Sequence, residues 1–296
     1  MRDGSDQRQQ RSTVCRTPPL LTGFWNYING LVGSLFVAGV NYSIIRFSCS
    51  IQSRRPCHHS LIQTMEAEYL RLADTIRTKA NVHNKPRLLV AVAGIPGSGK
   101  TTTASAVAQR LNSGPSPIRT VLIPMDGFHL PRATLDQLPN REEAYIRRGA
   151  PWTFDATRFL TFVHQLRRWA DQGQSSTENS HTLCAPSFDH EAKDPVEKGI
   201  VVTDDTTILI LEGNYVLLDE PQWREVAPLV DLRVFVDADP VEARDRIARR
   251  HVQVGIEETL ADAYCRADSN DCLNARTIRE KLIPPDIVVQ SVADPR

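Results

Sequence analysis

The eight residues from 94 to 101 constrain this chain more than any other part of its sequence. They fit the phosphate-binding pattern G-x-x-x-x-G-K-[ST] at every required position: Gly94-Ile95-Pro96-Gly97-Ser98-Gly99-Lys100-Thr101. The apolar run at 88–92 before them predicts a buried strand, and residues 102–111 after them predict a helix. A strand, a glycine-rich loop and a helix in this order predict an α/β fold that binds a nucleotide.

The residue types in this loop suit a triphosphate. Glycines let backbone N–H groups crowd around a phosphate without Cβ clashes, and the start of the following helix adds a positive dipole end. Lys100 supplies a cation for the β- and γ-phosphates, and the Thr101 hydroxyl can ligate Mg²⁺. We therefore expect ATP and Mg²⁺ as ligands, with residues 94–102 as the nucleotide site, Thr102 included.

Strands and helices alternate from residue 65 onward. Further strands are predicted at 120–123, 207–211, 232–236 and 287–290, and further helices at 66–79, 155–170, 240–251, 257–265 and 270–281. Residues 171–182 predict a polar, mobile surface loop. This alternation predicts a doubly wound parallel sheet covered by helices on both faces, with the ligand at the carboxyl ends of the strands.

The composition narrows the class of protein. With 41% hydrophobic and 24% charged residues the chain is globular, and its net charge of zero argues against a nucleic-acid partner. None of the six cysteines forms a C-x-x-C pair, so neither a zinc site nor a disulfide framework is indicated. We expect a reducing, cytoplasmic location, and the sequence does not reveal the oligomeric state.

The first 64 residues differ from the rest. They hold seven Arg and two Asp but no Lys or Glu, and residues 17–45 carry no charge. Residues 20–45 are long enough to cross a bilayer, although Asn, Gly and Ser dilute them. They are interpreted as a membrane anchor, as an organelle-targeting (mitochondrial) segment, or as noncoding sequence included in a gene model. The abrupt change at Met65 favours the last, with a catalytic domain at 65–296 and membrane contact only if the anchor is genuine.

Two acids follow predicted strands, where a doubly wound sheet places its active site. Asp126 follows the strand at 120–123, and Gly127 beside it suggests a tight turn that aims the carboxylate inward. Glu212 ends the strand at 207–211 and is placed to reach Mg²⁺ together with Thr101. Each acid alone would be interpreted as a turn cap. The phosphate-binding loop favours the functional interpretation.

Basic and aromatic residues gather in three further segments. Four arginines lie on one predicted helix, where they could close over phosphates or form a solvated basic face: Arg244, Arg246, Arg249 and Arg250. Two loops, at 147–155 and 187–195, mix basic, aromatic and turn residues and suit a small polar substrate. The histidines His129, His190 and His251 lack metal-ligand spacing, so no structural metal is expected.

Taken together, these blocks resemble the phosphoribulokinase/uridine kinase family over about residues 66–292. The resemblance is carried by residues 94–102, 126–129, 148–155, 186–190 and 212–215 and by the arginine-rich helix. Within the family, the chain resembles fungal ATP-dependent kinases and bacterial fructokinase-like or pantothenate kinase-like proteins. The blocks at 126–129 and 148–155 differ from those of true uridine kinases.

The resemblance implies a P-loop kinase fold with a helical lid, which transfers the γ-phosphate of ATP to a hydroxyl of a small metabolite. A sugar, a nucleoside or a pantothenate-like alcohol would serve as acceptor. The implied catalytic residues are Asp126 as general base, Lys100, and the lid residues Arg249 and Arg250. The expected substrate-binding residues are His129, Arg148, Phe188, His190 and Tyr215.

The alternative is a nucleotide-dependent NTPase or switch protein without an acceptor. A GTPase would carry Asn-Lys-x-Asp after the glycine-rich loop, but the chain's Asn84-Lys85 precedes the loop. An ABC-type ATPase would carry Leu-Ser-Gly-Gly-Gln, which the sequence lacks. Both absences favour a kinase.

Overall fold

A computed structural model describes residues 64–113, 115–172 and 182–292. The three interpretations of the N-terminal segment, and most of the predicted loop at 171–182, lie outside these residues. No helix within the described ranges is long and apolar enough to cross a bilayer.

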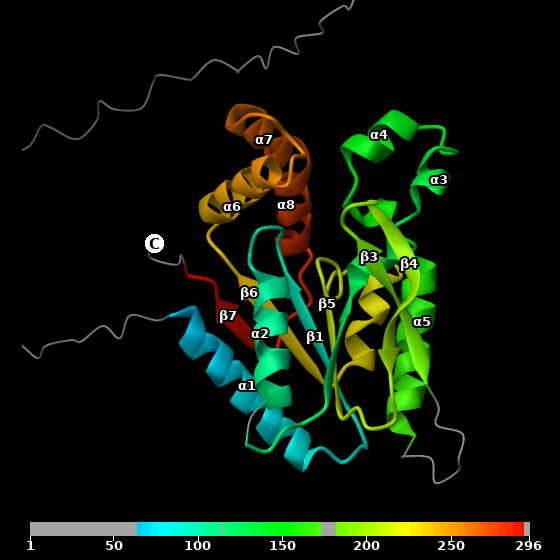
Figure 1. The fold of residues 1–296 in the computed structure, drawn as a ribbon, viewed down its shortest axis with the longest axis vertical. Helices are drawn as coiled ribbons and strands as arrows, with labels where there is room; N and C mark the ends of the chain where they lie inside the picture. The colour runs from blue at the N-terminus through cyan, green and yellow to red at the C-terminus, as the bar shows by residue number, and fades with distance from the viewer. Residues whose placement is uncertain (1–63, 114, 173–181, 293–296) are drawn as a thin grey trace, which may run out of the picture. The chain divides into compact units, whose positions relative to one another are not determined.

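A five-stranded parallel sheet forms the centre of the fold (Figure 1). Its strands, in spatial order, are β2 (Thr120–Pro124), β5 (Ile208–Gly213), β1 (Leu88–Gly94), β6 (Leu232–Asp237) and β7 (Ile287–Gln290). The two central strands, β1 and β5, are buried at every residue, as continuous apolar runs predict. Glu212 lies in register with both Pro124 and Val92, so the carboxyl ends of three strands meet at one edge.

Helices cover both faces of this sheet, as expected. On one face, α1 (Met65–Val82) and α2 (Lys100–Ser113) bury Leu72, Ile76 and Leu111 against β1 and β5. On the other, α5 (Ala156–Asp171) packs Phe159 and neighbouring apolar residues against the opposite side chains of the same strands. Asp155 caps the start of α5, because its side chain accepts a hydrogen bond from the Arg158 N–H.

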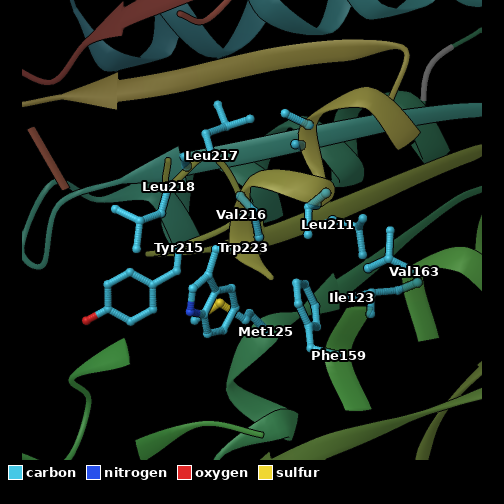
Figure 2. Packing of buried hydrophobic residues seen from close by; sticks show 14 of the residues in the cluster. Ile123, Met125, Phe159, Val163, Leu211, Tyr215, Val216, Leu217, Leu218 and Trp223 are labelled. Atoms are coloured by element: carbon cyan, nitrogen blue, oxygen red, sulfur yellow. The ribbon is translucent and has the colours of Figure 1, made fainter. Parts of the chain in front are cut away.

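A dense aromatic cluster fills the space between α5 and the segment that follows β5. Figure 2 shows Tyr215 on one side of Trp223 and Phe159 on the other. The ring centroids of Tyr215 and Trp223 lie 5.5 Å apart, and those of Phe159 and Trp223 lie 5.7 Å apart. Two short 3-10 turns, η3 (Trp223–Glu225) and η4 (Ala227–Leu229), lead from this cluster to β6.

One group of short elements lies at the carboxyl end of β2. It comprises the 3-10 turns η1 (Met125–Phe128) and η2 (Pro151–Thr153), the helices α3 (Arg132–Leu135) and α4 (Arg141–Ile146), and the strands β3 (Leu183–Asp189) and β4 (Asp194–Val202). The prediction of a loop at 187–195 is wrong, because these residues end β3, make a turn and begin β4 in an antiparallel hairpin. Both strands leave much of their surface exposed, so no clean apolar alternation marks them in the sequence.

A helical group lies at the same end of the sheet, beyond the start of α2 (Figure 1). It contains α6 (Pro240–Gln253), α7 (Leu260–Arg266), a five-residue π-helical turn η5 (Ala267–Asp271) and α8 (Cys272–Glu280). The three predicted helices are confirmed with shifted ends, whereas no sequence pattern predicted the π turn. This group occupies the place expected of the helical lid.

Candidate active site

The glycine-rich loop joins β1 to α2 in a conformation that needs its glycines. Gly97 and Gly99 have φ angles of +76° and +82°, which residues with a Cβ rarely adopt. A Cβ on Gly97 would also lie 2.3 Å from the Ala243 carbonyl oxygen, so the loop can contact α6 only because residue 97 is glycine. The Ser98 N–H donates to the Ile95 carbonyl at 3.1 Å and closes the turn that leads into α2.

Several polar groups of this loop are left available for a ligand. Ser98 is fully buried, and its hydroxyl has no hydrogen-bond partner among the described residues. The exposed Thr101 and Thr102 stand in the first turn of α2, where backbone N–H groups also lack intrahelical partners. Left-handed glycines, a helix start and an unpartnered hydroxyl fit a bound phosphate chain.

Glu212 lies against this loop and links it to β5. Its Oε1 accepts a hydrogen bond from Thr101 Oγ1 at 3.0 Å, and Lys100 Nζ lies 3.9 Å from the same oxygen. Burial raises the pKa of Glu212, which is only 3% exposed; Lys100 opposes this shift and the Asp126 carboxylate adds to it. A divalent cation would favour the ionised form.

The oxygens of Thr101 and Glu212 fit magnesium, which typically takes few protein ligands and completes its shell with phosphate oxygens and waters. Within the described residues, no group of three or more His, Cys, Asp or Glu side chains could hold a metal ion.

Asp126 stands in η1, directly after β2 and next to Glu212 in the neighbouring strand. Its carboxylate makes no hydrogen bond or ion pair within the described part of the chain. Its backbone carbonyl accepts from the His129 N–H at 3.2 Å and lies 2.8 Å from His129 Nδ1. Because a carbonyl only accepts, Nδ1 carries the proton, and Nε2 of the neutral ring is free to accept one. Burial lowers the pKa of His129, against the raising effect of Asp126, so the ring is neutral at pH 7.

The side chains around Asp126 form a polar-aromatic cluster, defined here as His129, Arg148, Phe188 and His190. The His129 ring lies between Phe154, at 3.9 Å between centroids, and Phe188, at 4.9 Å. The Phe188 ring is 5.3 Å from His190 and has the Arg148 guanidinium 5.9 Å from its centroid. Thus four of the predicted substrate-binding residues, from three separate segments, come together beside Asp126.

Arg148 is held from two sides. Its Nη2 donates to the Leu130 carbonyl at 3.2 Å and to Asp194 Oδ1 at 3.4 Å, while its buried Nε has no partner among the described residues. Phe154, which packs against the His129 ring, lies in the basic and aromatic loop at 147–155, but the sequence did not predict it as a site residue. Its aromatic character before the Asp155 cap was the only signal for it.

Tyr215 is the predicted substrate-binding residue that the structure places elsewhere. It is 0% exposed within the aromatic core, and its hydroxyl donates to the Gly149 carbonyl at 2.5 Å. Burial raises its pKa, so the hydroxyl stays protonated. With no surface to offer a substrate, Tyr215 instead fixes the residue next to Arg148.

The arginines of α6 separate into different environments. Arg246 Nη1 donates to the Gly97 carbonyl at 3.3 Å and to Ser291 Oγ at 2.8 Å, which fastens α6 to the glycine-rich loop. Arg244 pairs instead with Asp268. Arg249 and Arg250 are exposed, and the charge of Arg250 opposes the rise that burial causes in the pKa of Glu212.

A parallel sheet with a phosphate-binding loop after β1, an acid at the end of β5 and a helical group above them defines a P-loop kinase fold. The sequence pattern of the Phosphoribulokinase / Uridine kinase family matches residues 89–294, which is more than half of the chain. The protein belongs to this family.

Individual relatives agree with this assignment. A Schizosaccharomyces pombe protein named "Putative uridine kinase C227.14" is 38% identical over 209 residues, 71% of this chain and 85% of its own length. An Aspergillus versicolor protein, "ATP-dependent kinase-like protein notR'", is 41% identical over 54% of this chain and 90% of its own length. The crystal structure of YFH7 from Saccharomyces cerevisiae superimposes with a TM-score of 0.67 at 24% identity, covering 76% of this chain and 99% of that one, and shows the shared fold.

Proposed function

We propose that the protein is an ATP-dependent kinase that transfers the γ-phosphate to a hydroxyl of a small metabolite. The observation that carries the proposal is the position of Asp126. Asp126 follows Pro124, which lies opposite Glu212 in the sheet, and its backbone carbonyl lies 2.8 Å from Nδ1 of His129 in the polar-aromatic cluster, while its carboxylate has no partner among the described residues. A nucleotide hydrolase needs no such cluster beyond the phosphates, whereas a kinase needs a second site for its acceptor.

Residues 94–102 hold the triphosphate in this proposal. Backbone N–H groups of the loop and of the first turn of α2 bind the phosphate oxygens, and Lys100 turns from Glu212 toward the β- and γ-phosphates. The Thr101 hydroxyl and the Glu212 carboxylate hold Mg²⁺, which when bound neutralises charge on the phosphates.

On the other side, Asp126 accepts the proton of the acceptor hydroxyl as that oxygen attacks the γ-phosphorus in line, and the bond from the γ-phosphorus to the β,γ-bridging oxygen breaks to release ADP. His129 offers Nε2 as a hydrogen-bond acceptor, and Arg148 and His190 offer donors around the Phe188 ring. These side chains orient the acceptor so that its hydroxyl faces Asp126, and orientation supplies a large share of the rate enhancement. Tyr215 contributes by its hydrogen bond to the Gly149 carbonyl rather than by contact with the acceptor.

Lys100 and the arginines of α6 stabilise the negative charge that develops on the phosphate oxygens during transfer. The charge of Arg250 acts on Glu212, and Arg249, which precedes it in α6, is exposed as well. Both can approach the phosphates when nucleotide binds, as lid arginines do in phosphoryl transfer.

The acceptor class that the cluster supports is a small polar alcohol: a sugar, a nucleoside or a pantothenate-like compound. The relatives' names, a uridine kinase and an ATP-dependent kinase-like protein, are consistent with this range. The cytoplasmic location, the lack of a nucleic-acid partner and the domain boundary at residue 65 remain predictions.

The test is a phosphate-transfer assay on the full chain. Purified protein, Mg²⁺ and γ-labelled ATP are incubated with a panel of sugars, nucleosides and pantothenate-like alcohols, and labelled products are separated from free phosphate. We expect a labelled organic phosphate that depends on Mg²⁺ and disappears in Asp126→Asn. Free phosphate formed at one rate with or without every acceptor would instead support the alternative, an NTPase.

A further inference from the structure

The π-helical turn η5, between α7 and α8, has no part in the roles assigned so far. Such turns are rare in proteins and concentrate at functional sites, because they interrupt regular helical hydrogen bonding and redirect side chains. Here the turn redirects two consecutive residues, Asn270 and Asp271, toward different partners. One partner is the loop that carries Arg148, and the other is the helix α6.

The Asn270 side chain is hydrogen-bonded to the backbone of the loop that contains Arg148. The Asn270 Nδ2 group donates to the Arg148 carbonyl at 2.9 Å, and its Oδ1 accepts from Asn274 Nδ2 at 3.3 Å. In the opposite direction, the Arg147 guanidinium donates hydrogen bonds to the Ser269 carbonyl at 2.9 Å and to Asn274 Oδ1 at 3.1 Å. Asn270 and Asn274 are 3% and 2% exposed, so these are buried amides whose loss would leave polar atoms unsatisfied.

Asp271 faces the other way, toward the end of α6. Its Oδ2 lies 3.8 Å from Nε2 of the buried His251, which follows Arg250 in the chain. Burial raises the pKa of Asp271, while the charges of His251, Arg266 and Arg250 oppose that shift. Earlier in the same helix, Arg246 donates to the Gly97 carbonyl at 3.3 Å, so α6 contacts both the π turn and the glycine-rich loop.

We propose that Asn270 is a positioning residue for acceptor binding, and that the π turn links the position of α6 to that of the Arg148 loop. When the arginines of α6 settle on bound phosphates, the turn moves with His251 and Asp271, and Asn270 transmits this movement to the Arg148 carbonyl. Nucleotide binding thereby completes the acceptor site. This inference rests on the proposed function, because it assumes that nucleotide binds residues 94–102 and acceptor binds beside Arg148.

The link is measured by hydrogen exchange without knowledge of the acceptor. The full chain is compared with and without Mg²⁺ and the non-hydrolysable analogue AMP-PNP, and exchange is followed in peptides covering residues 94–102 and 147–153. In the wild-type protein we expect AMP-PNP to slow exchange in both segments. In Asn270→Ala, slowing at 94–102 persists and AMP-PNP affinity changes less than about threefold, while the slowing at 147–153 falls by about tenfold, the scale of one buried hydrogen bond.

The comparison of bound with free protein separates linkage from a merely structural role, which would speed exchange at 147–153 equally in both states. Arg147→Ala removes the bonds of the same loop to Ser269 and Asn274, weakens the connection from the loop side, and serves if Asn270→Ala does not fold. Arg276→Ala, on the exposed face of α8, is the matched control and should behave as wild type. Unchanged AMP-PNP-dependent slowing at 147–153 in the foldable variants, or none in the wild type, would overturn the inference while the proposed function stands. Absence of slowing at 94–102 in the wild type would refute the proposed function, and the inference with it.

Discussion

The two halves of the candidate active site are built in different ways. The nucleotide side, residues 94–102 with Glu212, comes largely from one continuous segment whose backbone makes the site. The acceptor side, which comprises residues 126–130, residues 147–155 and the β3–β4 hairpin, is assembled from segments far apart in the chain. Its parts are held by side-chain and backbone contacts such as Leu130 N–H to the Thr153 carbonyl at 2.9 Å.

This difference predicts how each side responds to substitution. A phosphate is bound mainly by backbone N–H groups, which require glycines and a helix start but few specific side chains. An acceptor is recognised by side chains such as Arg148 and His190, whose positions depend on a supporting network. We therefore expect substitutions on the nucleotide side to abolish turnover for every acceptor, and those on the acceptor side to change which acceptor is used.

The largest effect is expected for Lys100→Ala. Lys100 is the cation nearest Glu212 and the only Lys in residues 94–102, so its loss removes charge stabilisation during transfer. Turnover should fall by about 10³-fold or more with any acceptor. The measurement is initial-rate phosphate transfer, with circular dichroism to confirm folding. Lys85→Ala is the control and should keep full activity, because Lys85 is an exposed residue before β1 that pairs with Asp171. A similar loss in both variants would contradict the proposed role.

Asp126→Asn tests the boundary between the two sides. The amide keeps the shape of the side chain but cannot take the hydroxyl proton, so transfer should fall by about 10²- to 10⁴-fold. Affinity for Mg²⁺ and AMP-PNP should stay within about threefold, measured by calorimetry, because the phosphates bind elsewhere. Asp74→Asn, exposed on α1, is the matched control. Full activity of Asp126→Asn on a confirmed acceptor would show that another group takes the proton.

The sequence predicted the nucleotide side better than the acceptor side, because the nucleotide side is largely one continuous segment. The glycine-rich loop is local, so its residues and its place between a strand and a helix were readable directly. Asp126 and Glu212 were found because strands with apolar runs have visible ends, and parallel strands bring those ends together. The sheet and most helices were predicted for the same reason, since burial on both faces leaves a strong pattern.

The acceptor side was predicted less completely, because its geometry depends on contacts that no local pattern encodes. Gly127 was interpreted as a turn residue and does lie in the turn η1, but the sequence did not show that a Cβ there would lie 2.2 Å from the Pro186 carbonyl oxygen, so that glycine also permits the close approach of β3. Tyr215 resembled a site residue by its neighbourhood in the sequence and proved to be core. The π turn gave no signal, because its sequence is compatible with an ordinary helix.

A smaller effect, with opposite signs for activity and stability, is expected for Glu212→Gln. Burial raises the pKa of Glu212 above the ordinary value of 4.5, so the ionised side chain destabilises the free protein at neutral pH. The variant should have a higher Tm than wild type at pH 7.5 without nucleotide, and the difference should shrink as the pH falls through the raised pKa and the wild-type side chain gains a proton. Activity should fall about 10- to 100-fold through weaker magnesium binding.

Thermal unfolding from pH 7.5 to pH 4.5 and magnesium titration of the transfer rate measure these effects. Glu220→Gln, whose carboxylate pairs with Lys281 away from the glycine-rich loop, provides the control. A Tm for Glu212→Gln at or below that of wild type at pH 7.5 would show that Lys100 and Thr101 compensate the buried charge fully. The ionised Glu212 side chain would then not destabilise the free protein.

Tyr215→Phe should have the smallest effect and tests the support of the acceptor side most selectively. Removing the hydroxyl leaves the Gly149 carbonyl without its partner and should cost about 1 kcal/mol, or roughly 2–4 °C in Tm. Because Gly149 adjoins Arg148, the acceptor KM should rise a few fold while AMP-PNP affinity stays unchanged. Tyr145→Phe removes an identical atom from a bond to Asp136 on the surface, where water replaces it, and should change neither quantity. Equal changes in the two variants would mean that Tyr215 contributes no positional support to Arg148, which would then be positioned by its contacts with Asn270, Asp194 and the Leu130 carbonyl.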